Sequence, residues 1–226
     1  MSYRMRSRPS RRTSGKNSRR ALWLLIAFFL FALVLFIHTR CSSTTDDEGR
    51  GKLHIKGTRP ELDVQLLSVN PYSRPGIQVD HIDGIVIHYT ANPGASAQAN
   101  RNYFEQLASS KTTKASSNFI VGLDGEIIQC IPTWEIAYAS NERNGDTVSI
   151  ECCHPDETGH FEDATYRSLV QLTGWLCIKY GLSADKVIRH YDVTGKNCPK
   201  YFVENEEAWD RMLADICAKY EEHVSE

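Results

Sequence analysis

An unbroken run of 17 apolar residues, from Ala21 to Ile37, constrains this 226-residue chain more than any other feature. At about 1.5 Å per residue such a helix would be roughly 25 Å long, near the shortest length that crosses a membrane. The 20 residues before it carry eight arginines and lysines and no acidic residue. By the positive-inside rule this flank predicts one N-terminal transmembrane helix, with residues 1–20 as a basic cytoplasmic tail and the chain after residue 38 outside the cytoplasm.

A cleaved signal peptide and a buried core helix are the alternatives for residues 21–37. Signal peptides have an apolar stretch of about 7 to 15 residues followed by a small-x-small cleavage site. This run is longer and ends at His38-Thr39-Arg40-Cys41. We therefore expect an uncleaved single-pass anchor in the cell membrane, a linker and domain lead-in over 38–80, and one folded domain over 81–226.

The two parts of the chain differ in charge. Residues 1–52 hold 11 basic and 3 acidic side chains, whereas residues 53–226 hold 15 basic and 25 acidic ones. Nucleic-acid binding requires clustered cations on the folded body. The acidic body therefore argues against nucleic acid as a partner.

Patterns of apolar residues and turn residues predict the elements of the domain. The Asp124-Gly125 pair is a strong hairpin signal, Asp163 is a good helix N-cap, and Gly181 is a good helix stop. Alternation places Val148 and Ile150 on one face of their strand and Glu151 on the other. We expect strands over 83–90, 117–123, 126–131, 147–153 and 186–190, and helices over 95–108, 163–180 and 204–220. This order predicts an α/β fold, a single domain with a mixed central β-sheet flanked by helices.

Seven cysteines are present, at positions 41, 130, 152, 153, 177, 198 and 217. Outside the cytoplasm they could form disulfides, but their number is odd and a bond between the adjacent Cys152 and Cys153 would be strained. Free cysteine is also commonly a small buried apolar residue. The sequence leaves the pairing open.

Two histidines and one cysteine form a candidate metal site. His88 and His190 end predicted strands, and Cys198 follows His190 by eight residues. Zinc accepts nitrogen and sulfur ligands, and three protein ligands leave a fourth position for water, which is the catalytic pattern. The alternative is that both histidines are structural and Cys198 is simply buried, because composition alone does not establish proximity.

Four segments of the chain resemble the zinc-dependent N-acetylmuramoyl-L-alanine amidases, the family related to T7 lysozyme, phage endolysin amidase domains and peptidoglycan recognition proteins. The resemblance covers roughly residues 80–217, and the H-x-D-V-x4-C-P stretch is its most specific part. It implies that His88, His190 and Cys198 bind Zn²⁺. It also implies that Glu151 activates the attacking water and that Lys196 steadies the oxyanion. The segments are 87–90, 117–125, 149–151 and 190–199.

Each of these residues also has a structural interpretation. Glu151 lies on a solvated face or in a polar cleft, and Lys196 is a solvated loop residue or a catalytic cation. Asp192 orients a ligand histidine or caps a turn. Several family members place a tyrosine before the Phe119 position, where this chain has Ser117 and Asn118. Zinc, Lys196 and Asn118 would then hold the substrate carbonyl.

The resemblance implies an enzyme that cleaves the amide bond between N-acetylmuramic acid and the L-alanine of the stem peptide in peptidoglycan. The predicted topology places its catalytic domain on the outer side of the membrane, where peptidoglycan lies. The alternative is a non-catalytic, membrane-anchored peptidoglycan-binding receptor. Non-catalytic members lack the cysteine ligand, and Cys198 is present here, which favours the enzyme.

Overall fold

A computed structural model describes residues 59–225 of the chain, with side chains up to residue 219. The sheet is formed by six strands. They are β1 (Asp63–Val64), β2 (Gly84–Tyr89), β3 (Phe119–Val121), β4 (Ile127–Gln129), β5 (Thr147–Cys152) and β6 (Val187–Arg189). The helices are α2 (Ala97–Ser110), α3 (Asp163–Tyr180), α4 (His190–Thr194), α5 (Lys200–Glu204) and α6 (Glu206–Ser225), with 3-10 turns η1 (Asn141–Gly145) and η2 (Ala184–Lys186).

The strands lie in the order β1-β4-β3-β5-β2-β6. Every neighbouring pair is parallel except β3 and β4, which form the predicted hairpin around Gly125. Gly125 has a φ of +85°, a conformation that favours glycine. The mixed sheet predicted from the sequence is thus confirmed, and the hairpin strands are shorter than expected because residues 122–126 form the turn.

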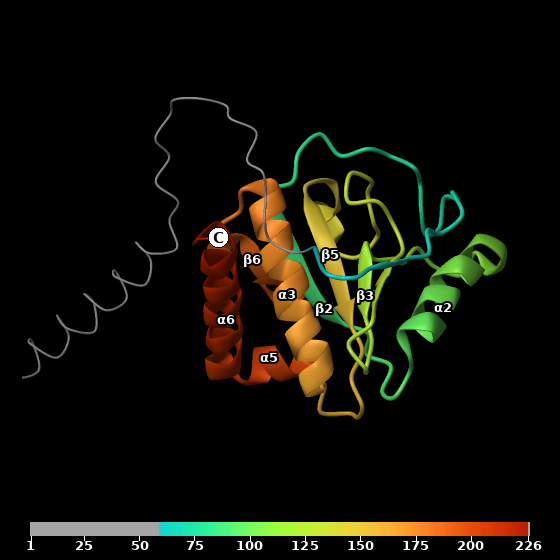
Figure 1. Cartoon of the computed structure of the whole chain (residues 1–226). Helices are drawn as coiled ribbons and strands as arrows, with labels where there is room; N and C mark the ends of the chain where they lie inside the picture. The colour runs from blue at the N-terminus through green and yellow to red at the C-terminus, as the bar shows by residue number, and fades with distance from the viewer. Residues whose placement is uncertain (1–58, 226) are drawn as a thin grey trace, which may run out of the picture. The chain divides into compact units, whose positions relative to one another are not determined.

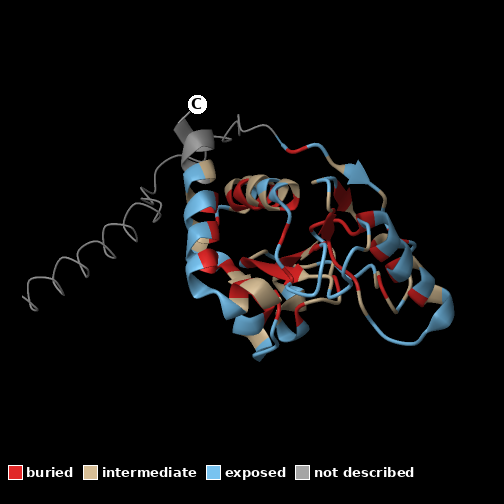
Figure 2. Ribbon diagram, turned by 90° about the horizontal axis from the view of Figure 1, so that it is seen from below, coloured by how far each residue is buried: buried red, intermediate tan, exposed pale blue. Residues whose placement is uncertain are grey.

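Helices cover the two faces of the sheet unequally (Figure 1). Helices α3 and α6 pack side by side over one face, where Ile85, Ile87 and Ile150 meet the apolar sides of both helices. On the other face α2 packs over β3 and β4 only. Figure 2 shows the buried residues gathered in the sheet and on the helix sides that face it. Over β2 and β5 this second face is contacted by the segment around Ser140 instead of by α2.

Helix α3 has the predicted bounds, but its N-cap is different. Glu162 is the capping residue and makes no side-chain cap hydrogen bond, while the predicted cap Asp163 is the first helical residue. Asp163 instead lies 4.0 Å from Arg167, one turn later. Gly181 ends the helix as predicted, with a φ of +64°.

The C-terminal region differs from the prediction in two places. The strand predicted to end at His190 ends at Arg189, because the Asp192 carboxylate accepts a hydrogen bond from the Arg189 backbone N–H at 2.8 Å and starts helix α4 at His190. The helix predicted over 204–220 is α6, which begins at Glu206, and the unpredicted short helix α5 precedes it and ends at Glu204.

The lead-in to the domain contributes to the fold. Strand β1 pairs with β4, and Leu67 is fully buried in the core beside α2. Within residues 59–225 no helix is long and apolar enough to cross a membrane, and the predicted anchor at 21–37 lies outside the described residues. Five cysteines are free and buried, namely Cys130, Cys152, Cys153, Cys177 and Cys198.

Candidate active site

The part of the second sheet face that lies beyond α2 carries His88 and Glu151. These two residues are register partners on the parallel strands β2 and β5, so their side chains leave the same face. Ile120, the next partner across on β3, packs under α2. The site therefore begins where the cover provided by α2 ends.

His190 and Cys198 come from the short segment after β6. His190 opens helix α4, and the chain turns back so that the Tyr191 backbone N–H donates to the Cys198 carbonyl at 2.9 Å. Arg189, just before His190, is fastened by its guanidinium to Asp192 at 2.9 Å and to Glu206 at 2.7 Å. These contacts hold the segment against the sheet and helix α6.

The structure brings the three predicted ligands together. His88, His190 and Cys198 are 1%, 5% and 2% exposed, and one donor atom from each lies within 4.8 Å of the others. The two Nδ1 atoms are 3.1 Å apart, and the Cys198 Sγ is 3.8 Å from the His88 Nδ1. Among the described residues this is the one group of three or more such side chains close enough to share a metal ion.

The donor set fits zinc. Tetrahedral zinc, with Zn–N near 2.0–2.1 Å and Zn–S near 2.3 Å, separates its ligand atoms by roughly 3.4–3.6 Å. The two separations from His88, 3.1 and 3.8 Å, bracket these values, and the third donor pair lies within 4.8 Å. Two imidazoles and one thiol are nitrogen and sulfur donors of the kind that zinc prefers.

Burial sets the protonation of the three groups. Loss of solvation, together with the neighbouring His190, holds the pKa of His88 well below its usual value, and burial also lowers the pKa of His190. Both rings are therefore neutral at pH 7 and have a lone pair to offer. Burial raises the pKa of the Cys198 thiol to about 12, so a cation is needed to hold it as a thiolate at neutral pH.

Glu151 lies beside this group as an unpaired carboxylate. Its Oε2 is shut off from solvent and has no hydrogen-bond partner. Burial raises the pKa of Glu151 to about 8, and the charge of Lys196 acts in the opposite direction. Lys196 also lowers the pKa values of both histidines, which indicates that its ammonium group lies close to the whole cluster.

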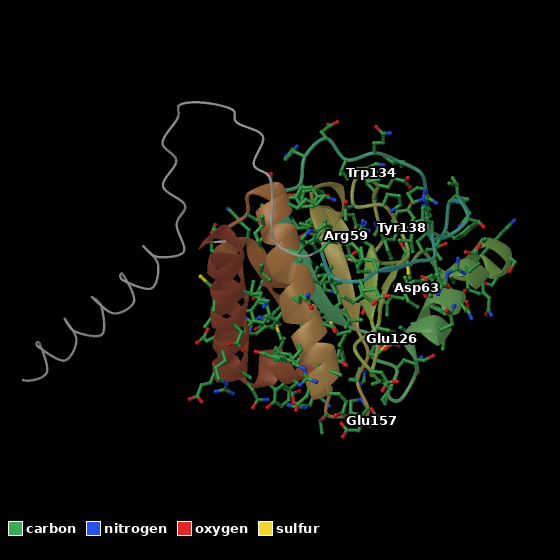
Figure 3. The ribbon with its side chains drawn as sticks, in the orientation of Figure 1. Arg59, Asp63, Glu126, Trp134, Tyr138 and Glu157 are labelled. Carbon is green, nitrogen blue, oxygen red and sulfur yellow. The ribbon has the colours of Figure 1, made fainter. Side chains whose placement is uncertain are left out.

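A cavity of about 390 Å³ opens onto these residues. Its lining includes Glu151, His88, His190, Lys196, Lys114 and Tyr138. The Lys114 ammonium lies 5.2 Å from the centre of the Tyr138 ring. Figure 3 shows Tyr138 and Trp134 near one end of the strands, away from Glu157. A larger hollow of about 640 Å³ lies near Arg143 and Tyr180 and contains none of the predicted site residues.

Two residues next to the site were missed from the sequence. The Ser140 Oγ lies 3.2 Å from the His88 Nε2, and the Asn141 Oδ1 lies 2.9 Å from the His190 Nε2. They follow the Tyr138-Ala139 segment in a loop without periodicity. No sequence signal links them to histidines that are 52 and 49 residues away.

Asp192 and Asn118 have structural roles. Asp192 caps helix α4 through Arg189, so the turn-capping alternative for this residue is confirmed. Asn118 is fully buried, and its amide bonds Ser149 and the carbonyls of Pro132 and Glu135. With its amide engaged in this way, Asn118 does not face the cavity.

Comparisons with known proteins agree with this site. The family model described as N-acetylmuramoyl-L-alanine amidase (Amidase_2) matches residues 78–201, which are more than half of the chain. A probable N-acetylmuramoyl-L-alanine amidase of Bacillus licheniformis is 38% identical over 152 residues, covering 62% of this chain and 42% of that protein. The amidase BlyA of Bacillus subtilis is 33% identical over 174 residues, which cover 68% of this chain and 46% of that protein. The chain thus spans less than half the length of these relatives.

Solved structures share the fold. The catalytic domain of XlyA is 25% identical, with a TM-score of 0.59, and the match covers 69% of this chain and 99% of that domain. PlyL is 23% identical with the same TM-score, and that match covers 69% of this chain and 96% of the PlyL chain. The matched domain includes all five predicted site residues. The chain belongs to the N-acetylmuramoyl-L-alanine amidase family.

Proposed function

We propose that the chain is a zinc-dependent amidase that hydrolyses the bond between N-acetylmuramic acid and the L-alanine of the peptidoglycan stem peptide. The observation that carries this proposal is the convergence of three metal-type donors with an unpaired carboxylate. His88, His190 and Cys198 approach within 4.8 Å of one another, and Glu151 lines the same cavity. The relatives named above are N-acetylmuramoyl-L-alanine amidases.

His88, His190 and Cys198 would hold the zinc. A zinc ion in that position supplies a Lewis acid, which lowers the pKa of water and polarises a carbonyl. The neutral imidazoles are already in the form that binds metal. The cavity that Glu151 and Lys196 line also contacts His88 and His190.

Glu151 is suited to move the proton. Its carboxylate takes a proton from the attacking water and hands it to the alanine nitrogen as the amide bond breaks. A pKa near the working pH serves both steps, and burial raises that of Glu151 to about 8. The Glu151 Oε2 has no hydrogen-bond partner within the protein, so its capacity to accept a proton is not used by another residue.

Lys196 supplies positive charge at the developing oxyanion. It follows Gly195, whose φ of +76° ends helix α4, and it lines the cavity with Glu151. A cation placed there stabilises the negatively charged transition state more than the neutral substrate. Lys114 and Tyr138, which also line the cavity, offer a cation and an aromatic face for the acidic glycopeptide substrate.

We further propose that residues 21–37 anchor the domain in the cell membrane. The argument is their uninterrupted apolar sequence and the basic residues 1–20 before it. Residues 38–80 would connect the anchor to the catalytic domain over 81–226, on the outer side of the membrane. Cysteine-labelling reagents that do not cross membranes should then label cysteines introduced after position 38 in intact cells. Labelling of these cysteines only after the cells are broken would refute this topology.

Product analysis tests the proposed reaction. Purified peptidoglycan treated with the full chain should gain new L-alanine amino termini and no new reducing sugar ends. Glu151→Gln should release almost none, while the exposed Glu157→Gln should match the unaltered protein. Peptidoglycan that is bound but not cut would instead support the receptor, and new reducing ends would indicate a glycosidase.

A further inference from the structure

Each of the two site histidines has its outer nitrogen bonded to a neighbour from one loop. The Ser140 Oγ is 3.2 Å from the His88 Nε2, and the Asn141 Oδ1 is 2.9 Å from the His190 Nε2. The inner Nδ1 atoms face each other at 3.1 Å. We propose that Ser140 and Asn141 are positioning residues, which fix the orientation and tautomer of both rings so that each presents Nδ1 to the zinc. This inference rests on the proposed zinc site.

The chemistry of Asn141 determines which nitrogen of the His190 ring is left for the metal. The Asn141 Oδ1 can only accept a hydrogen bond, so the His190 Nε2 carries the hydrogen and Nδ1 keeps its lone pair. The Ser140 hydroxyl can donate or accept a hydrogen bond, and when Nδ1 of His88 binds the metal this hydroxyl accepts from the His88 Nε2–H. A neutral imidazole has one hydrogen, and placing it on Nε2 leaves Nδ1 of both rings as the ligand.

The loop that carries these residues is held in place from within. The Asn144 Oδ1 accepts from the backbone N–H groups of Ala139 at 3.1 Å and Ser140 at 2.6 Å. The Arg143 guanidinium pairs with Asp146 at 2.8 Å across the turn. Ser140 is 1% exposed. The hydroxyl of Ser140 and the amide of Asn141 are therefore presented from a fixed backbone.

The backbone at Asn141 is itself unusual. Its φ is +53°, in the left-handed region that non-glycine residues seldom occupy. Glycine would adopt this conformation more easily, but it would have no amide to offer to His190. A strained conformation that presents a side chain to a ligand residue is the pattern expected of a site under functional constraint.

Both ligand histidines depend on hydrogen bonds from the same loop. His88 comes from strand β2 and His190 from helix α4, and two adjacent residues of one loop, Ser140 and Asn141, bond the outer nitrogens of the two rings. Loss of either outer hydrogen bond lets one ring turn or change tautomer. We expect weaker metal binding by about 10- to 100-fold, as for other partners of ligand histidines.

Two substitutions at Asn141 and one control separate the effect of the lost hydrogen bond from the effect of the changed backbone conformation. Asn141→Gly removes the amide and relieves the positive φ, so the fold is retained. Asn141→Asp keeps an acceptor oxygen. Lys111→Gly is the matched control, because Lys111 has a φ of +55°, is exposed, and ends helix α2 away from the site.

The test measures zinc affinity of the full chain in detergent by competition with a chromophoric chelator. Asn141→Gly should bind zinc about 10- to 100-fold more weakly, whereas Asn141→Asp and Lys111→Gly should stay within about threefold of the unaltered chain. Ser140→Ala should weaken binding in the same direction. Thermal unfolding of the metal-free Asn141→Gly protein should occur at or above the unaltered midpoint.

Nitrogen NMR of the metal-free protein gives a second, metal-independent measurement. The His190 ring should be the Nε2–H tautomer in the unaltered chain, and a mixture of tautomers in Asn141→Gly. Unchanged zinc affinity and tautomer in Asn141→Gly would overturn the inference, as would equal weakening by Asn141→Asp. An unaltered chain that fails to bind zinc at all would instead overturn the proposed function.

Discussion

The side chains of His88 and Glu151 leave the same face of the sheet as register partners on adjacent parallel strands. Backbone pairing alone therefore places the proposed metal ligand His88 beside the proposed proton-transfer residue Glu151. His190, Cys198 and Lys196 arrive from the segment after β6, which is fastened at Arg189. The sheet therefore positions two residues of the proposed site, and the segment after β6 positions the other three.

Glu151→Gln should separate metal binding from turnover. The amide is nearly isosteric with the carboxylic acid but cannot accept the proton, so amide hydrolysis should fall by about 10²- to 10⁴-fold. Zinc content, measured by atomic absorption, should stay at that of the unaltered chain. Activity near the unaltered level would remove Glu151 from the mechanism.

The raised pKa of Glu151 also predicts a pH dependence of stability in the metal-free protein. Its pKa is about 8 in the fold, against 4.5 for the unperturbed group, so the native state binds more protons than the unfolded state between these values. The contribution of Glu151 to the free energy of unfolding is therefore fully present below pH 4.5 and is lost as pH rises through 8, at up to about 1.4 kcal/mol per pH unit.

Urea denaturation of the metal-free protein at pH 5, 6, 7 and 8 measures this effect. The difference in unfolding free energy between the unaltered chain and Glu151→Gln should shift in favour of the variant as pH rises. Comparing the two proteins cancels the contributions of the histidines and other groups. A difference that stays constant across this range would show that Glu151 is not buried as described.

Lys196→Met should lower the turnover number with little effect on zinc content. Removing one group that stabilises an oxyanion typically costs 10²- to 10³-fold in kcat. Lys186→Met is the matched control, because Lys186 is exposed and lies 4.0 Å from Asp185 outside the site. If both variants retain full turnover, Lys196 is only a solvated loop residue.

Arg189→Gln should destabilise the domain. The guanidinium is 8% exposed and bonds Asp192, Glu206 and the Phe202 carbonyl, so its loss leaves acidic groups without their partner. We expect the free energy of unfolding to fall by roughly 2–4 kcal/mol. Arg167→Gln is the control, because Arg167 is 72% exposed and 4.0 Å from Asp163, and its effect should stay within about 0.5 kcal/mol.

The sequence predicted the elements that have strong local signals. Strand β2, the Gly125 hairpin and helix α3 follow from apolar runs, a turn dipeptide and a glycine stop. It did not predict the start of helix α4 at His190, because that depends on a bond between the Asp192 side chain and the Arg189 backbone. Nor did it predict helix α5, whose five residues are too few to show a helical period.

The five site residues were identified through motifs, but the residues that hydrogen-bond the two histidines were not. His88, His190 and Cys198 occupy recognisable positions in the chain, so a resemblance could select them. Ser140 and Asn141 lie in a loop with no periodicity, and they reach the histidines only because the fold closes a separation of about 50 residues. Contacts of that kind are set by tertiary structure and leave no local pattern.

Titrating a chelator against the full chain tests the central claim most directly. Zinc per chain and release of L-alanine amino termini from peptidoglycan should be followed in the same samples. We predict one zinc per chain at the start, a proportional fall of both quantities, and recovery of both when zinc is restored. Undiminished release of amino termini from a chain that has lost all its zinc would contradict the account.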